Sequence, residues 1–140
     1  MLGVRKYERS YVEACEAKVD SDVAAFKKLA AAARKSGASA RALGAVESIY
    51  FNNMVLVLDH LFVHRLRTVE GKDGNALNEV RVLGDSIMLH GGTMTPDKSI
   101  KLTADNSILG YDEGNHIDVN EADFVRLAKA FFAEIGEKFV

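Results

Sequence analysis

The chain has 140 residues, 48% of them hydrophobic and 27% charged, which is the size and composition of one globular domain spanning residues 1–140. These values exclude a disordered chain, and the longest apolar run, Met54 to Leu58, is too short to cross a bilayer. The only cysteine, Cys15, excludes an internal disulfide and any Cys-x-x-Cys motif. Arg5 and Lys6 interrupt any apolar leader, so we expect a soluble cytoplasmic protein without membrane association.

The formal net charge of −2 is unevenly distributed along the chain. Residues 1–67 hold 11 Lys and Arg against 7 Asp and Glu, whereas residues 68–140 hold 7 against 13. Opposite charges of this kind can attract within one fold or between subunits. No dense block of Lys and Arg stands out, so nucleic-acid binding is not favoured.

The first predicted element is a helix over residues 5–35, followed by a stop signal at Ser36-Gly37. Apolar residues recur there at three- and four-residue steps, which places them on one helical face: Val4, Tyr7, Tyr11, Cys15, Val19, Val23, Phe26, Ala30 and Ala33. A second helix is predicted over residues 39–67, with Ser39 as its N-cap. Its segment from Phe51 to Leu66 is the most apolar of the chain and should lie at the centre of the core.

A glycine-rich loop over residues 69–75 separates this helix from a third one, predicted over residues 76–89. Short β-prone runs follow at residues 99–103, 108–111 and 116–119, with a turn over residues 112–115 that is typical of a hairpin tip. A last helix should begin after Asn120, where Asp123 can bond back to the cap. Its buried face should hold Phe124, Ala128, Phe131, Ile135 and Phe139, joined by Val125 and Phe132.

The predicted fold is therefore mainly α: an antiparallel bundle of about four helices, with a small β-hairpin between the third and last helices. Helices of about 30 residues are long for a domain of this size. Such helices often extend past the core of their own chain and pack against a second subunit. We therefore predict a homodimer.

His60 and His64 form the first candidate site, because an i, i+4 spacing on a helix would let both imidazoles bind one metal ion. A third ligand could come from Asp85, or else from Glu79, His90 or His116. The zinc-protease pattern His-Glu-x-x-His is not met, since Leu61 follows His60. The other interpretation is a hydrated polar stripe on the second helix.

A second candidate is a basic patch made of Arg65, Arg67, Lys72 and Arg81. Guanidinium groups beside the free N–H groups of a helix start can bind an anion such as phosphate or carboxylate. Acidic residues in the same segment could instead neutralise these side chains internally.

The block Gly84-Asp85-Ser86-Ile87, after the apolar run 80–83, resembles the nucleophile block of the GDSL (SGNH) hydrolases. The resemblance covers about eight residues and implies a nucleophilic Ser86 on a strand-to-helix turn. The Asp-x-x-His base of that family does not occur after Ser86, and whether residues 79–83 form a strand or a helix decides between the two interpretations.

Together these features predict a non-enzymatic module that binds a small ligand or a protein partner. The alternative is a metal-dependent helical-bundle enzyme, a hydrolase or thiol transferase, in which His60 and His64 hold a divalent cation.

Overall fold

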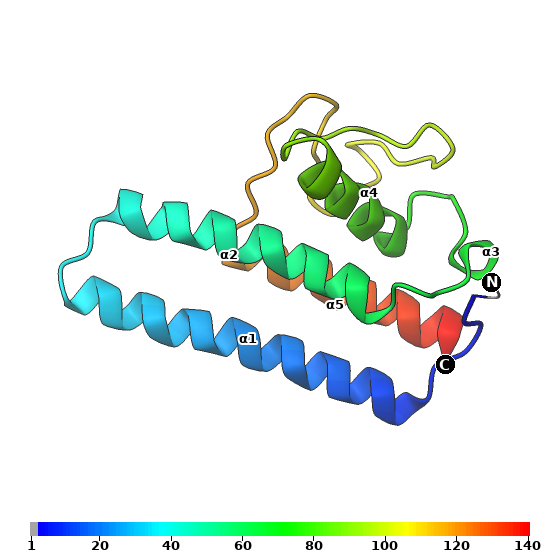
Figure 1. Ribbon diagram of the computed structural model, residues 1–140, viewed down its shortest axis with the longest axis horizontal. Helices are drawn as coiled ribbons and strands as arrows, with labels where there is room; N and C mark the ends of the chain where they lie inside the picture. Colours follow the sequence, from blue (N-terminus) through cyan, green and yellow to red (C-terminus); the bar gives the residue numbers. More distant parts are fainter. Residues whose placement is uncertain (1–2) are drawn as a thin grey trace.

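The computed structural model describes residues 3–140 and contains five helices in the order α1 (Arg9–Lys35), α2 (Ala40–Leu61), α3 (Arg67–Glu70), α4 (Ala76–Leu89) and α5 (Glu121–Phe139). The mainly helical prediction is confirmed. The helices α1 and α2 form a long antiparallel hairpin, and α5 lies against it (Figure 1). Both α2 and α5 also contact α4, which lies across α2 on the side away from α1 (Figure 1).

The core lies where α2, α4 and α5 meet, and its largest buried side chains are phenylalanines. Phe51, Phe62, Phe124, Phe131 and Phe139 are each 0–1% exposed. Phe62 lies at the centre of one aromatic cluster and contacts Tyr7 before α1, Tyr11 of α1 and two phenylalanines of α5. The apolar positions predicted for the last helix therefore face this core, except Val125, which is exposed.

The α2 helix ends earlier than predicted, at Leu61 instead of near Arg67. The Arg65 side chain folds back and donates from Nη1 to the carbonyl oxygens of Phe62 at 3.0 Å and Asp59 at 3.4 Å. Both carbonyl groups lie at the end of α2, and each also accepts a backbone N–H, that of Phe62 at Asp59 and that of Arg65 at Phe62. The apolar pattern alone did not indicate that α2 ends at Leu61, because Arg65, which binds the carbonyl groups at this end, lies four residues further along the chain.

The structure does not show the β-hairpin predicted within residues 99–119, which form turns and irregular backbone. A single antiparallel bridge pairs Thr93 with His116. Glu79 of α4 is 2% exposed, and its carboxylate accepts hydrogen bonds from the backbone N–H groups of Ile108 at 2.6 Å and Leu109 at 2.9 Å. The two N–H groups bonded to Glu79 are then not available for hydrogen bonds between the strands of a hairpin.

Among residues 3–140, no helix combines the length and the apolar character needed to span a bilayer.

Candidate functional site

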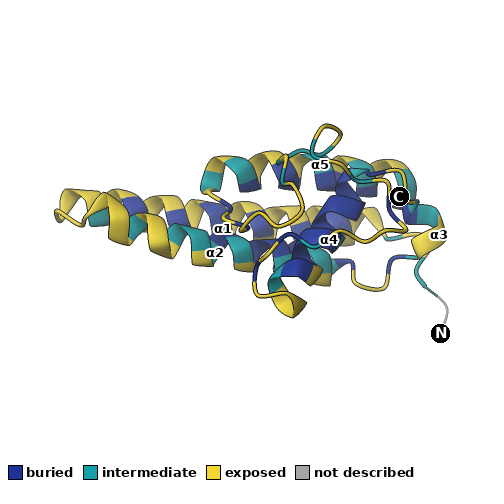
Figure 2. Cartoon of the chain, turned by 90° about the horizontal axis from the view of Figure 1, so that it is seen from above, coloured by how far each residue is buried: buried dark blue, intermediate teal, exposed yellow. Residues whose placement is uncertain are grey.

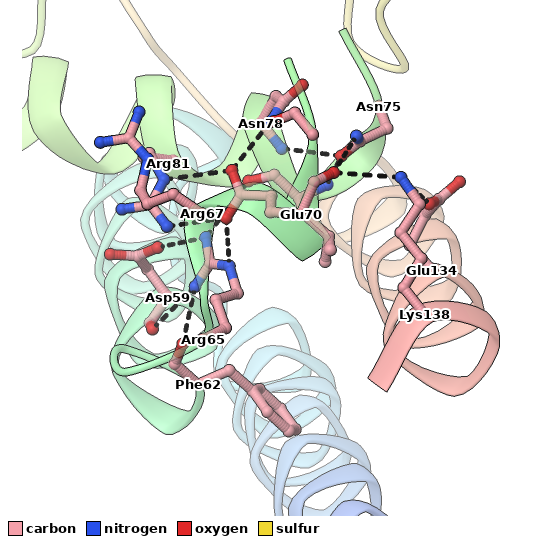
Figure 3. A network of polar contacts seen from close by, with 12 residues as sticks. Asp59, Phe62, Arg65, Arg67, Glu70, Asn75, Asn78, Arg81, Glu134 and Lys138 are labelled. Atoms are coloured by element: carbon pink, nitrogen blue, oxygen red, sulfur yellow. Dashed lines mark hydrogen bonds and ion pairs between the residues drawn. The ribbon is translucent and has the colours of Figure 1, made fainter. Parts of the chain in front are cut away.

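A buried cluster of charged side chains lies between the end of α2, the short helix α3 and the face of α4 (Figure 3). At its centre is Glu70, which is 0% exposed. Its carboxylate accepts from Arg65 Nε at 2.7 Å, from Arg81 Nη2 at 2.7 Å and Nε at 3.1 Å, and from Asn78 Nδ2 at 2.8 Å. Two guanidinium groups thus share one carboxylate in a site from which most water is excluded.

Arg65 is held by several elements at once. Its Nη2 group lies 2.9 Å from Asp59 Oδ1 and 3.3 Å from the carbonyl oxygen of Leu77, and its guanidinium lies 5.7 Å from the ring centroid of Phe131. Arg65 is only 2% exposed. Because its charge is matched and its donors are engaged, this side chain stabilises the junction of α2, α4 and α5.

The net effect of these contacts on Glu70 is a lowered pKa. Burial by itself raises the pKa of this carboxyl, but the hydrogen bond from Arg81 and the charges of Arg65 and Arg81 outweigh it. The hydrogen bond from Asn78 acts in the same direction. The geometry therefore holds Glu70 as a carboxylate.

The backbone around the cluster is also tied down. The carbonyl oxygen of Glu70 accepts from Asn75 Nδ2 at 2.8 Å and from Lys138 Nζ of α5 at 3.1 Å. Asn75 caps α4 by accepting from the N–H groups of Leu77 and Asn78 at 2.9 and 3.1 Å. At this helix start, the N–H groups of Leu77, Asn78 and Glu79 therefore have protein partners instead of being free for an anion.

The structure divides the predicted basic patch into two pairs. Arg65 and Arg81 lie in the buried cluster, both bonded to Glu70. Arg67 and Lys72 are exposed, and Arg67 forms a long ion pair of 3.9 Å with Asp97. Arg67 is the first residue of α3, and Lys72 lies in the loop that follows this helix.

The predicted metal ligands lie on a nearby part of the surface. Since α2 ends at Leu61, His64 lies beyond the helix, so His60 and His64 do not share one helical face, although both line a hollow of about 330 Å³. No three or more His, Cys, Asp or Glu side chains come together among residues 3–140 in a group that could hold a metal ion. Asp85 and His60 do, however, line one groove.

That groove lies between α2 and α4, with Lys18 of α1 at its edge, and has a volume of about 550 Å³. Most of the groove surface is apolar, and four polar side chains reach it. The lining residues are Lys18, Leu56, Val57, Asp59, His60, Leu61, Val63, Gly84, Asp85 and Met88. Met88 is 66% exposed and Val63 43% exposed, although both are apolar. Exposed apolar side chains around a concave surface are typical of a binding site.

The groove has a negatively charged part where Asp59 and Asp85 face it from α2 and α4. Asp59 is bonded to Arg65. The side chain of Asp85 is exposed and forms no ion pair or hydrogen bond with residues 3–140. Partial burial raises the pKa of Asp85, and the charge of Asp59 adds to this effect, while Arg81 and Arg67 oppose it. Because Asp59 and Asp85 place two carboxylates at the groove and Asp85 has no ion-pair partner within residues 3–140, this part of the groove favours a ligand with a cationic group.

The serine of the short Gly-Asp-Ser-Ile block does not occupy a nucleophile turn. Ser86 lies within α4 and is 0% exposed. Its Oγ accepts from the backbone N–H of Thr95 at 3.0 Å. Residues 79–83 are helical, so the strand-to-helix turn that the hydrolase resemblance implies is not formed.

The alternative expectation, that acidic residues of the same segment neutralise the basic side chains internally, describes Arg65 and Arg81, which both bind Glu70. The sequence did not indicate that Asp59 binds Arg65 as well. A carboxylate between Arg65 and Arg81 in the sequence suggests an ion pair, but only the turn after α2 shows that Glu70 binds both arginines. Compared with known proteins, the chain matches no protein-family model, no curated protein and no solved structure.

Proposed function

We propose that the protein is a non-enzymatic binding module and that the α2–α4 groove is its ligand site. The observation that carries this proposal is an apolar groove of about 550 Å³ with the unpaired carboxylate of Asp85 beside Asp59. This size lies within the range of small-molecule sites, which combine apolar walls with a few convergent polar groups.

The proposed ligand is an apolar molecule or side chain that carries an ammonium or guanidinium group. Its apolar part would contact Leu56, Val63 and Met88, and its cation would lie against Asp85. Arg65 and Arg81 support this arrangement indirectly, because Glu70 and Asp59 hold their positive charges in the cluster behind the groove. An anionic ligand at Arg67 and Lys72 remains the other prediction, without a concave site to favour it.

The test compares three probes of the same chain length: an alkylammonium ion, an alkyl carboxylate and a neutral alcohol. Binding is measured from the amide resonances of α2 and α4 in heteronuclear NMR titrations. One exposed ion pair contributes about 1 kcal/mol, so the ammonium probe should bind about fivefold more tightly than the alcohol. The carboxylate should bind most weakly.

Two variants locate the site. Asp85→Asn should remove the preference for the ammonium probe, and Met88→Gln should weaken all three probes. Asp20→Asn is the matched control, because Asp20 lines a different groove, between α1 and α5. Tightest binding of the carboxylate, with shifts around Arg67 and Lys72, would contradict the proposal and favour the anion site.

A further inference from the structure

The closed end of the α1–α2 hairpin is a separate surface that the proposed function does not use. It extends beyond α4 and α5 and is largely exposed (Figures 1 and 2). Residues 23–46 contain five Lys and Arg residues and no Asp or Glu. Lys27 forms an ion pair with Glu121 at 3.5 Å. The other four, which we call the basic tip, are exposed and form no ion pair within residues 3–140: Lys28, Arg34, Lys35 and Arg41.

The loop between α4 and α5 has the opposite character. Residues 102–125 contain six Asp and Glu residues and no Lys or Arg. Glu121 is paired with Lys27, and Asp123 with Arg126 at 2.9 Å. The remaining four, which we call the acidic loop, are exposed and form no ion pair in the described part of the chain: Asp105, Asp112, Glu113 and Asp118.

Within one copy the two ranges meet only through Lys27 and Glu121, because the hairpin beyond Lys27 projects away from the loop (Figure 1). Four cations and four carboxylates are therefore left on one chain in two separate places. Like charges gathered in one place repel one another, and an opposite surface relieves that repulsion. A second copy of the chain supplies the opposite surface for both.

We infer that the protein forms a two-fold symmetric homodimer in which the basic tip of each copy lies on the acidic loop of the other. Two-fold symmetry produces this contact twice, so all eight charged groups of each chain are matched. Exposed surface ion pairs contribute little affinity by themselves. The apolar side chains on the hairpin supply an additional contribution, since Leu29, Val46 and Ile49 are 61%, 49% and 65% exposed.

Nucleic acid is the other polyanion that could bind a basic tip, but the hairpin end fits it less well. The basic tip carries no aromatic side chain for base stacking, and its neighbours are mostly alanines. Nucleic acid would also leave the acidic loop without a partner and would be repelled by it. A second copy satisfies both surfaces, whereas a nucleic acid satisfies one.

The experiment is sedimentation equilibrium of the full chain and of charge-reversed variants. The tip variant carries Arg34→Glu and Lys35→Glu, and the loop variant carries Asp112→Lys and Glu113→Lys. All four side chains are exposed, so circular dichroism should show unchanged folding. The wild type should dimerise, with an affinity about tenfold lower when NaCl is raised from about 0.05 M to about 0.5 M.

Each variant alone should be monomeric, because the two reversed side chains cancel the charge of their surface and repel the opposing one at both contacts. An equimolar mixture of the tip and loop variants should dimerise again, since both contacts regain opposite charges. A monomeric wild type at low salt would overturn the inference, as would a dimer that both variants retain. Salt-sensitive binding of a DNA duplex to a monomeric wild type, lost in the tip variant, would assign the tip to nucleic acid and also overturn it.

Discussion

Replacing Glu70 by glutamine should lower the free energy of unfolding by about 3 kcal/mol, because removing one member of a buried ion pair leaves the other charge uncompensated. The carboxylate accepts four hydrogen bonds from three side chains, at 2.7 to 3.1 Å. Glutamine keeps the size of the side chain but replaces one acceptor oxygen by a donor and removes the charge. Arg65, which is 2% exposed, would then keep Asp59 as its remaining carboxylate partner.

Urea unfolding followed by circular dichroism measures this change, and the slope with denaturant should stay the same if only stability is altered. The control is Glu13→Gln on the exposed side of α1, which should change stability by less than about 0.5 kcal/mol. A loss below about 1 kcal/mol for Glu70→Gln would refute the reasoning. It would mean that desolvation of the cluster offsets nearly all of its electrostatic stabilisation.

The same cluster determines a pH dependence. The pKa of Glu70 is below its unfolded value of 4.5, so its contribution to stability is complete above pH 4.5 and is lost as pH falls through the folded pKa. Burial raises the pKa of Glu79 despite its two backbone hydrogen bonds, so Glu79 acts in the opposite sense and favours the fold below pH 4.5. Glu70→Gln should therefore flatten the acid limb of a plot of unfolding free energy against pH. Glu79→Gln should steepen it.

Three further substitutions test the packing, each measured by urea unfolding. Gly74→Ala should destabilise by about 2 kcal/mol or more, because Gly74 has a φ of +91° and a Cβ there would lie 2.5 Å from the carbonyl oxygen of Lys101. The matched control Gly136→Ala in α5, with nothing within 4 Å, should stabilise by up to about 1 kcal/mol. Phe62→Ala should cost about 3–5 kcal/mol, since the ring is 0% exposed, and a cost near 1 kcal/mol would mean that the aromatic cluster repacks. Asn75→Ala should cost at least about 1 kcal/mol through loss of the α4 cap, whereas an unchanged midpoint would contradict that role.

The helices were predictable because their signals are local. The α4 bounds agree with those predicted, since Asn75 caps its start and two glycines follow its end. The α5 start after Asn120 agrees for the same reason, because the cap is a contact between neighbouring residues. The apolar spacing of α1 and α5 also identified most of the side chains that these two helices contribute to the core.

The predictions that failed depended on contacts between residues far apart in the sequence. The apolar pattern of α2 continues past Leu61, yet the helix ends there because Arg65 turns inward to bind its carbonyl groups and Glu70. The β-prone runs before α5 form no hairpin, because a buried carboxylate from α4, Glu79, takes two of their backbone N–H groups. Periodicity cannot indicate either effect, since it records which face is apolar and not which polar groups meet.

By itself, therefore, the sequence determined the helical class, most helix ends and the apolar faces, because propensity, capping and periodicity act within a few residues. Only the tertiary structure decided the role of the charged residues. It buried Arg65 and Arg81 against Glu70, left Arg67 and Lys72 exposed, and brought Asp85 to the same groove as His60. The physical reason is that a charge acquires its function from its partners and its exposure to water, and both are set by how the helices pack.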